Sequence, residues 1–313
     1  MDITSFILGR KNGRDSVKTQ EKTVTPSESE IVVTPDTGYD ALSKVIVEAV
    51  ETGGGSDGST VGLLRAETTF PTTIATSALA FTLNNTLYCV CRDSSVGSVI
   101  LRLDSDGWTQ VCVATAALTS SEAPYLTTAA FAEYNGEIHF VGTDYVKFHC
   151  KFVGSNFVKV STPTVAADYC GLFVEDGELF FAQINKKLIW CYNGTEWVES
   201  NYQMPSTRTK KIVNLNGNLF MLCGSNFYSY SKGVSTLLGT APSSSYYLYV
   251  CNNNIYCFSK GASISASIYK WTGTEFIEVA QLAITGNANC EYNGRLHMAG
   301  YPNARSHVSA ELP

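Results

Sequence analysis

The chain has 313 residues, of which 44% are hydrophobic and 16% are charged, and its formal net charge is −6. This apolar content can form a core, and the 17 Tyr and 15 Phe residues suit half-buried strands. The acidic balance argues against sequence-independent nucleic-acid binding, because that binding neutralises phosphates with Lys and Arg.

Residues 1–15 begin with a short apolar patch, Phe6-Ile7-Leu8, which is followed by a basic run from Arg10 to Arg14. The early acid and the missing basic n-region are not typical of a signal peptide. No apolar run approaches the roughly 18 residues that cross a bilayer. We therefore expect synthesis in the cytoplasm and no membrane insertion. The segment is either a frayed terminus or a docking peptide that orders against a partner.

Residues 16–50 contain three short β-prone runs, Lys22–Pro26, Ile31–Pro35 and Ser43–Val50, with a turn at Asp36–Asp40. They predict a unit of three small strands. Such a unit has a thin core and is marginal by itself. It gains stability from docking or self-association, so we expect a homo-oligomer.

The sequence from Lys22 to Val50, after the opening Met1–Gly9, resembles a short N-terminal module of tailed-bacteriophage head-fibre and tail-fibre-like proteins. The resemblance covers about the first sixth of the chain. It implies attachment to other virion proteins through residues 1–50 and localisation in the virion. The residues that would make this attachment are Phe6, Ile7, Leu8, Tyr39 and Leu42.

Residues 52–60 are a Gly/Ser-rich stretch that predicts a flexible linker. It separates an N-terminal module, residues 1–51, from a second domain at residues 61–313.

The second domain repeats a four-stranded unit that is clearest from Lys210 to Leu238. Asn216-Gly217 separates its first two apolar runs, and this dipeptide predicts a type I′ hairpin turn. The first turn recurs at Asn84-Asn85, Asn135-Gly136, Asp176-Gly177, Asn252-Asn253 and Asn293-Gly294. A period of roughly 40 residues is typical of propeller blades. We count six units, starting near Leu79, Ala129, Gly171, Lys211, Leu248 and Ala288.

The two ends of this domain are incomplete in complementary ways. Val61–Pro71 has the pattern of a fourth strand without the first three, whereas the sixth unit has strands near Ala288–Tyr292, Leu296–Gly300 and Ser306–Leu312 but no fourth. An N-terminal strand that completes the last blade would close the ring. The sequence thus predicts an all-β fold, a six-bladed propeller closed by an N-terminal outer strand and preceded by a small β anchor module.

The repeat also resembles kelch-type propellers. The units have a tight turn, then an apolar strand that often ends in Gly (Gly142, Gly224, Gly300), and four of them then have an aromatic residue that opens the outer strand. The fourth unit has Val234 in the aromatic position. The double glycine of kelch blades is absent.

The irregular loops between the second and third strands, and between successive units, are the predicted binding face, because binding residues are often found on loops of a rigid scaffold. The linker enters at the opposite, tight-turn face. The candidate ligand-binding residues on the loop face are Tyr125, Asp144, Tyr145, Lys186, Lys187, Tyr202, Arg208, Tyr246, Tyr301, Asn303 and Arg305.

Catalytic and metal-binding patterns are missing from the sequence: no HExxH, CxxC, GxSxG or Walker motif occurs. His139 and His297 occupy the same position in different blades, so we expect no contact between them. The acids Glu133, Glu175, Asp176 and Glu291 adjoin tight turns. Most of the ten cysteines fall within predicted strands, which favours free, buried thiols and a reducing compartment. We expect no catalytic activity, no cofactor and no metal.

Together these features predict a phage virion accessory protein, anchored by its N-terminus, whose propeller binds a host-surface glycan or protein. The alternatives are a purely structural capsid, collar or tail decoration protein and a glycan hydrolase.

Overall fold

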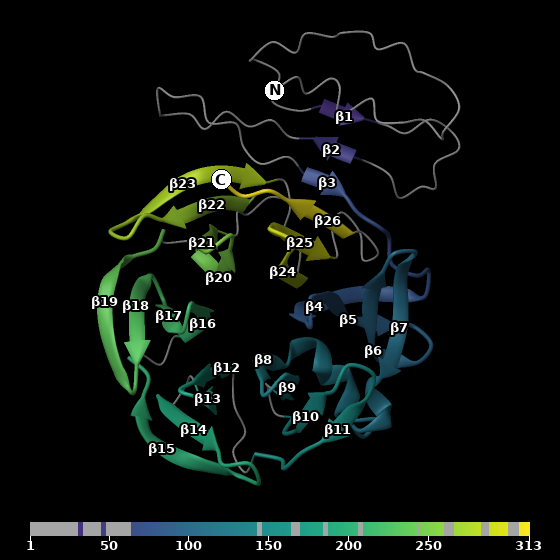
Figure 1. Cartoon of the computed structure of the whole chain (residues 1–313), viewed down its shortest axis with the longest axis horizontal. Coiled ribbons are helices and arrows are strands. Elements are labelled where there is room, and N and C mark those ends of the chain that lie inside the picture. Colours follow the sequence, from purple (N-terminus) through teal and green to yellow (C-terminus); the bar gives the residue numbers. More distant parts are fainter. Residues whose placement is uncertain are drawn as a thin grey trace.

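The computed structural model describes residues 31–33, 45–47, 64–142, 146–163, 170–183, 187–205, 209–242, 245–259, 266–282, 288–299 and 307–313. Six four-stranded antiparallel sheets stand around a common centre as the blades of a propeller (Figure 1). The predicted all-β, six-bladed fold is therefore confirmed.

The strands follow one another within each blade from the inner to the outer edge. Blade 1 comprises β4 (Ile74–Leu83), β5 (Thr86–Asp93), β6 (Gly97–Asp104) and β7 (Gly107–Val113), and blade 2 comprises β8 (Ala130–Tyr134), β9 (Glu137–Val141), β10 (His149–Phe152) and β11 (Phe157–Lys159). Blade 3 comprises β12 (Cys170–Glu175), β13 (Glu178–Gln183), β14 (Leu188–Tyr192) and β15 (Trp197–Gln203), and blade 4 comprises β16 (Thr209–Leu215), β17 (Asn218–Cys223), β18 (Asn226–Ser231) and β19 (Val234–Thr240). Blade 5 comprises β20 (Ser245–Cys251), β21 (Asn254–Ser259), β22 (Ala266–Trp271) and β23 (Phe276–Leu282), and blade 6 comprises β24 (Ala288–Tyr292), β25 (Arg295–Ala299), β26 (His307–Ala310) and β3 (Leu64–Ala66).

The first turn of every blade has the backbone conformation that its sequence predicts. Asn216 and Gly217 have φ of 53° and 82°, and both central residues are likewise at positive φ in the other five first turns. Positive φ at both positions is the requirement of a type I′ turn and the reason that Asn and Gly recur there.

The ring closes as the sequence predicts. β3 pairs with β26 in antiparallel register, with Leu64 opposite Ala310 and Ala66 opposite Val308. Just after β3, the Glu67 amide donates to the His307 carbonyl at 2.8 Å. Blade 6 thereby takes its fourth strand from the other end of the domain.

Six apolar clusters fill the six boundaries between neighbouring blades. The cluster between blades 6 and 1, for example, contains Phe70, Leu87 and Trp108, and the cluster between blades 2 and 3 contains Val141, Phe181 and Trp197. The core is thus a ring of six contacts rather than one central mass.

The connection between blades 1 and 2 contains two short 3-10 helices, η1 (Ala114–Ala116) and η2 (Ala123–Thr128). Their buried residues, including Ala114 and Leu126, join the cluster between these blades. The sequence predicts an irregular loop here. The segment forms short helices instead because its spaced apolar residues are buried on one side.

The N-terminal module is described only at β1 (Ile31–Val33) and β2 (Val45–Val47), which pair antiparallel with Val32 opposite Ile46. Two of the three predicted strands are therefore present in part. The predicted run Lys22–Pro26, the linker and the predicted attachment residues Phe6, Ile7, Leu8, Tyr39 and Leu42 lie outside the described residues.

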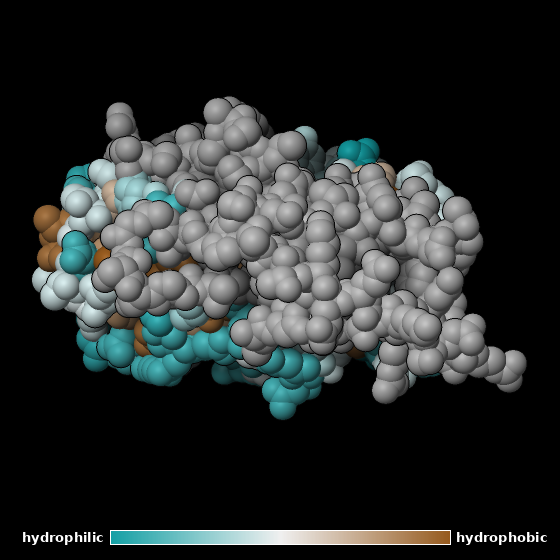
Figure 2. Space-filling view, turned by 90° about the horizontal axis from the view of Figure 1, so that it is seen from above, coloured by the Kyte–Doolittle hydropathy of each residue, from teal (hydrophilic) through white to brown (hydrophobic). Residues whose placement is uncertain are grey.

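The outer strands expose scattered apolar side chains rather than one large surface. Figure 2 shows apolar atoms on the described part of one side as small patches between hydrophilic ones. The large exposed apolar residues of the outer strands are Val158, Val198, Val234, Leu237 and Ile277.

Candidate functional site

A pocket of about 580 Å³ lies at the mouth of the central channel, between the inner strands β8, β12 and β16 of blades 2 to 4. Its lining comes from the last residues of these strands and from the tight turns that follow them. The pocket is therefore on the tight-turn face. β3 begins at the same face, since Leu64 pairs with Ala310 and Ala310 also pairs with Leu296 beside the Asn293-Gly294 turn.

The register of the blades decides which side chain each inner strand presents at the channel mouth. We call the rim position the inner-strand residue that pairs with the apolar residue following the first turn. In chain order, the rim residues are Thr82, Glu133, Val174, Asn214, Val250 and Glu291. Blades 2, 4 and 6 thus supply a carboxylate or amide, and blades 1, 3 and 5 supply Thr or Val.

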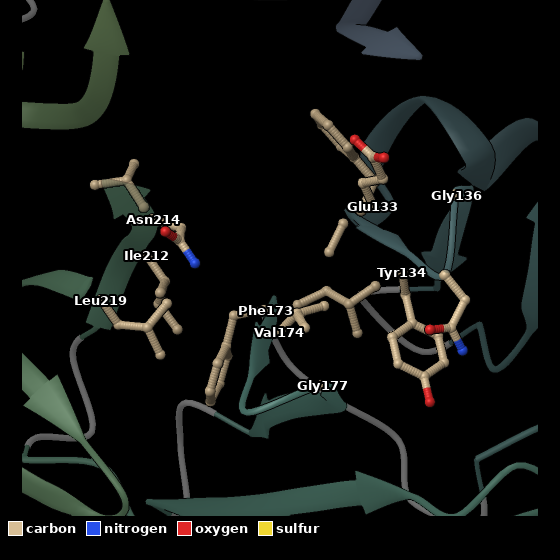
Figure 3. A pocket seen from close by; sticks show the side chains of 14 residues that line it. Glu133, Tyr134, Gly136, Phe173, Val174, Gly177, Ile212, Asn214 and Leu219 are labelled. Carbon is tan, nitrogen blue, oxygen red and sulfur yellow. The ribbon is translucent and has the colours of Figure 1, made fainter. Parts of the chain in front are cut away.

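Glu133 and Asn214 are exposed and stand on opposite sides of the open middle of the pocket (Figure 3). The Asn214 Oδ1 accepts the Gly217 amide at 2.9 Å, which fixes the side chain and leaves its Nδ2 as a donor toward the pocket. Val174 lies between them at the rim of blade 3. The site therefore offers a hydrogen-bond acceptor at Glu133, a donor on the opposite side at Asn214 and an apolar surface at Val174.

Contacts between neighbouring turns hold this face together. The Lys232 amide donates to Glu175 Oε1 at 2.8 Å, and its Nζ lies 2.6 Å from Asp176, which joins blades 3 and 4. The Asn216 Nδ2 donates to Asn253 Oδ1 at 2.6 Å, which joins blades 4 and 5. These links fix the positions of the rim residues.

Two buried histidine pairs lie behind the rim. His139 Nδ1 and His149 Nε2 are 2.8 Å apart in blade 2, and His297 Nδ1 and His307 Nε2 are 2.9 Å apart in blade 6. A tyrosine of the inner strand packs edge-on against the first histidine of each pair, Tyr134 at 5.3 Å in blade 2 and Tyr292 at 5.4 Å in blade 6. Tyr134 also lines the pocket, so the blade 2 pair stands directly behind it.

The neighbours of the blade 2 pair determine its tautomers. Trp197 of blade 3 donates its Nε1–H to His149 Nδ1 at 3.2 Å, and an indole can only donate. With Nδ1 accepting from the indole, His149 carries its proton on Nε2 and donates it to His139 Nδ1. A backbone hydrogen bond with Ser161 favours the charged form of this ring, but burial outweighs it. The remaining proton of His139 is on Nε2, which faces Glu137 Oε2 at 3.7 Å.

Burial makes these histidines hard to protonate. It lowers the pKa of His139 to about 4 and that of His149 to about 3, the nearby histidine adding to the effect on His149. Burial likewise lowers the pKa of His307 to about 3. An additional proton would also place two N–H groups face to face in the blade 2 chain of hydrogen bonds. The sequence correctly separates His139 from His297 but misses the pairing within each blade.

The predicted loop-face residues are only partly described. Tyr125 is 40% exposed on η2, and Lys187 is exposed immediately before β14. Tyr202 is half-buried between blades 3 and 4, with its ring 5.5 Å from that of Phe180, so it packs in an interface rather than on a loop. Tyr246 lies in β20, and the structure does not describe its side chain; Asp144, Tyr145, Lys186, Arg208, Tyr301, Asn303 and Arg305 lie outside the described residues.

The cysteines that the structure describes are free thiols, as predicted, and most are buried. Within the described ranges, no group of three or more His, Cys, Asp or Glu side chains is placed to hold a metal ion. No helix in that part of the chain is long and apolar enough to span a membrane.

No protein-family model and no curated protein matches the chain. Solved structures do match it. The structure of YjhT is 12% identical, covers 77% of this chain and 95% of its own, and superposes with a TM-score of 0.56. A triple arginine-to-alanine mutant of AofleA from Arthrobotrys oligospora is 11% identical, covers 80% and 87%, and has a TM-score of 0.50. At these identities the similarity establishes the propeller fold alone.

Proposed function

We propose that the chain is a virion accessory protein whose propeller binds a glycan of the host surface in the channel-mouth pocket. The observation that carries the binding half is the pocket itself. Ligand pockets typically combine apolar walls with a few fixed polar groups, and this one does so with Glu133 and Asn214 above Val174. The virion half is supported by the resemblance of residues 1–50 to phage fibre modules.

This proposal moves the binding site from the loop face to the tight-turn face. β3 begins on that face, so the N-terminal module joins the propeller on the side of the pocket. A linker with the composition of residues 52–60 spans roughly 15–18 Å. That reach lets the propeller turn its pocket away from the particle.

Removing the two polar side chains of the pocket tests whether the propeller binds a glycan there. The variant Glu133→Ala/Asn214→Ala should bind candidate host cells and arrayed glycans at least tenfold more weakly than the wild-type full chain, since two directional hydrogen-bonding groups are lost. Ile277→Ala, on the exposed outer strand of blade 5, is the control and should bind like wild type. Wild-type binding by the double variant would place the site elsewhere, and no binding by the wild type would remove the glycan function.

If the N-terminus attaches the protein to the virion, the full chain should copurify with phage particles and a chain lacking residues 1–50 should not. Quantitative mass spectrometry of purified particles measures both. Equal incorporation of the shortened chain would contradict anchoring by the N-terminus. Because the shortened chain retains the whole propeller, its solubility and circular dichroism serve as the control for folding.

A second candidate function is a purely structural decoration protein. The position of the pocket on the face where β3 begins favours it, because the same face would then pack on the particle. It predicts that the free chain and the particle-bound chain differ: the pocket would be accessible to a glycan probe only in the free chain.

A further inference from the structure

We propose that the channel-mouth pocket accepts a neutral or amine-bearing sugar and rejects anionic glycans. This inference rests on the proposed glycan-binding function and names the class of ligand for the same site.

The charge of the pocket is the first argument. Among the described side chains that line it, Glu133 is the only carboxylic acid, and none is a Lys, Arg or His. Glu133 is exposed and has no ion pair or hydrogen bond within the described part of the chain. Two lysines of the bordering blades are engaged elsewhere: Lys151 Nζ lies 2.7 Å from Glu137, and Lys232 Nζ lies 2.6 Å from Asp176. The described lining therefore presents a carboxylate without a compensating cation.

The geometry of the opposite wall is the second argument. Asn214 commits its oxygen to the Gly217 amide, so only the Nδ2 donor is directed into the pocket. A ligand that spans the pocket must accept a hydrogen bond at Asn214 and donate one at Glu133. A sugar hydroxyl does both, and a ring carrying an ammonium group donates more strongly to the carboxylate.

The apolar lining is the third argument. Phe131, Leu172 and Ile212 line the pocket below the rim, because each lies two residues before a rim residue on the same inner strand. These surfaces suit the C–H face of a pyranose ring, while its hydroxyl edge meets Glu133 and Asn214. A phosphate or a uronic-acid carboxylate would place a second negative charge near Glu133 with no cation in the described lining. Once the bound ligand excludes water from Glu133, this repulsion should weaken binding by about an order of magnitude.

The test measures the binding of three trisaccharides to the full chain by isothermal titration calorimetry. Their repeating units are glucosamine, N-acetylglucosamine and galacturonic acid. The glucosamine and N-acetylated probes should bind at least tenfold more tightly than the galacturonic-acid probe. Glu133→Gln keeps the size of the side chain and removes its charge. It should lower the affinity for the glucosamine probe by about tenfold or more and change the affinity for the N-acetylated probe by less than about threefold. It should raise the affinity for the acidic probe.

Glu291→Gln is the matched control, because Glu291 occupies the same rim position in blade 6 and does not line the pocket. It should leave all three affinities within about twofold of wild type. Preferred binding of the acidic probe by the wild-type chain, or equal effects of the two Gln variants, would overturn the inference while leaving the glycan function intact. If neither these probes nor any arrayed glycan binds, the proposed function itself fails. Binding of a lysine-bearing peptide without any sugar would overturn the ligand class.

Discussion

The wild-type chain should lose about 6 kcal/mol of stability between pH 7 and pH 4 through His139 and His149, roughly 3 kcal/mol for each. Replacing His139, His149 and Trp197 together with phenylalanine should remove this part of the loss. Each histidine takes up a proton near pH 6.5 in the unfolded chain. In the folded chain the pKa is about 4 for His139 and about 3 for His149. The unfolded state therefore binds more protons across this window, and stability falls as the pH falls through it.

The other ionisable groups around the pair are Glu137, Lys151, Tyr134 and Tyr192. The variant retains all of them, so the change in pH dependence reports the histidines. Urea unfolding of wild type and variant at pH 7 and pH 4 measures it. An unchanged pH dependence in the variant would contradict the assignment.

The chain itself shows that three phenylalanines fit this arrangement. At the boundary of blades 4 and 5, Phe220, Phe227 and Phe276 occupy the positions that His139, His149 and Trp197 occupy at the boundary of blades 2 and 3. The replacement of Trp197 is needed because its N–H would otherwise lose its buried acceptor, at a cost of about 1–3 kcal/mol. Phe227→Leu is the control: it should lower stability equally at both pH values.

Phe70→Ala should cost about 3–5 kcal/mol of the free energy of unfolding, a large share of the stability of a typical domain. Phe70 is 2% exposed and its ring lies 4.6 Å from that of Trp108 in blade 1. Trp108 in turn donates its Nε1–H to the Thr68 carbonyl at 3.1 Å. Phe70 thus fixes the segment after β3 to blade 1, while β3 itself completes blade 6. Denaturant unfolding measures the loss, and a cost below about 1 kcal/mol would contradict this closure.

Two comparisons separate closure from ordinary loss of apolar surface. Val234→Ala, at a side chain that is 67% exposed on β19, should change stability by less than about 0.5 kcal/mol. A chain without residues 1–70 should fail to unfold cooperatively. Moving residues 61–70 to a position after Pro313, with a short Gly/Ser connection, should restore cooperative unfolding, because Leu64 pairs with Ala310 near that end.

Much of the fold could be predicted because local chemistry determines it. A type I′ turn requires positive φ at both central residues, and Asn, Asp and Gly tolerate it best, which identifies the first turn of each blade. Two incomplete ends imply closure by a strand from the other end of the domain. The histidine pairs depend on register across the loops between the second and third strands, and turn chemistry does not reveal that register. One signal was available: both pairs have the same separation of ten residues.

The proposed pocket was harder to predict than the fold. Irregular loops are the usual place for binding residues, and that rule selected the loop face. The pocket instead depends on how far the inner strands β8, β12 and β16 stand from the channel axis and on which residues reach the rim. Neither follows from turn chemistry. Glu133 was visible in the sequence as an acid beside a tight turn, but its position opposite Asn214 emerges only from the packing of three blades.

The most direct test is a crystal structure of the full chain with the glycan that it binds most tightly. We expect the sugar between β8 and β16, with its hydroxyl or amine groups donating to the Glu133 carboxylate and one of its oxygens accepting from the Asn214 Nδ2. A sugar bound among the loops of the opposite face, near Tyr125 and Lys187, would contradict it.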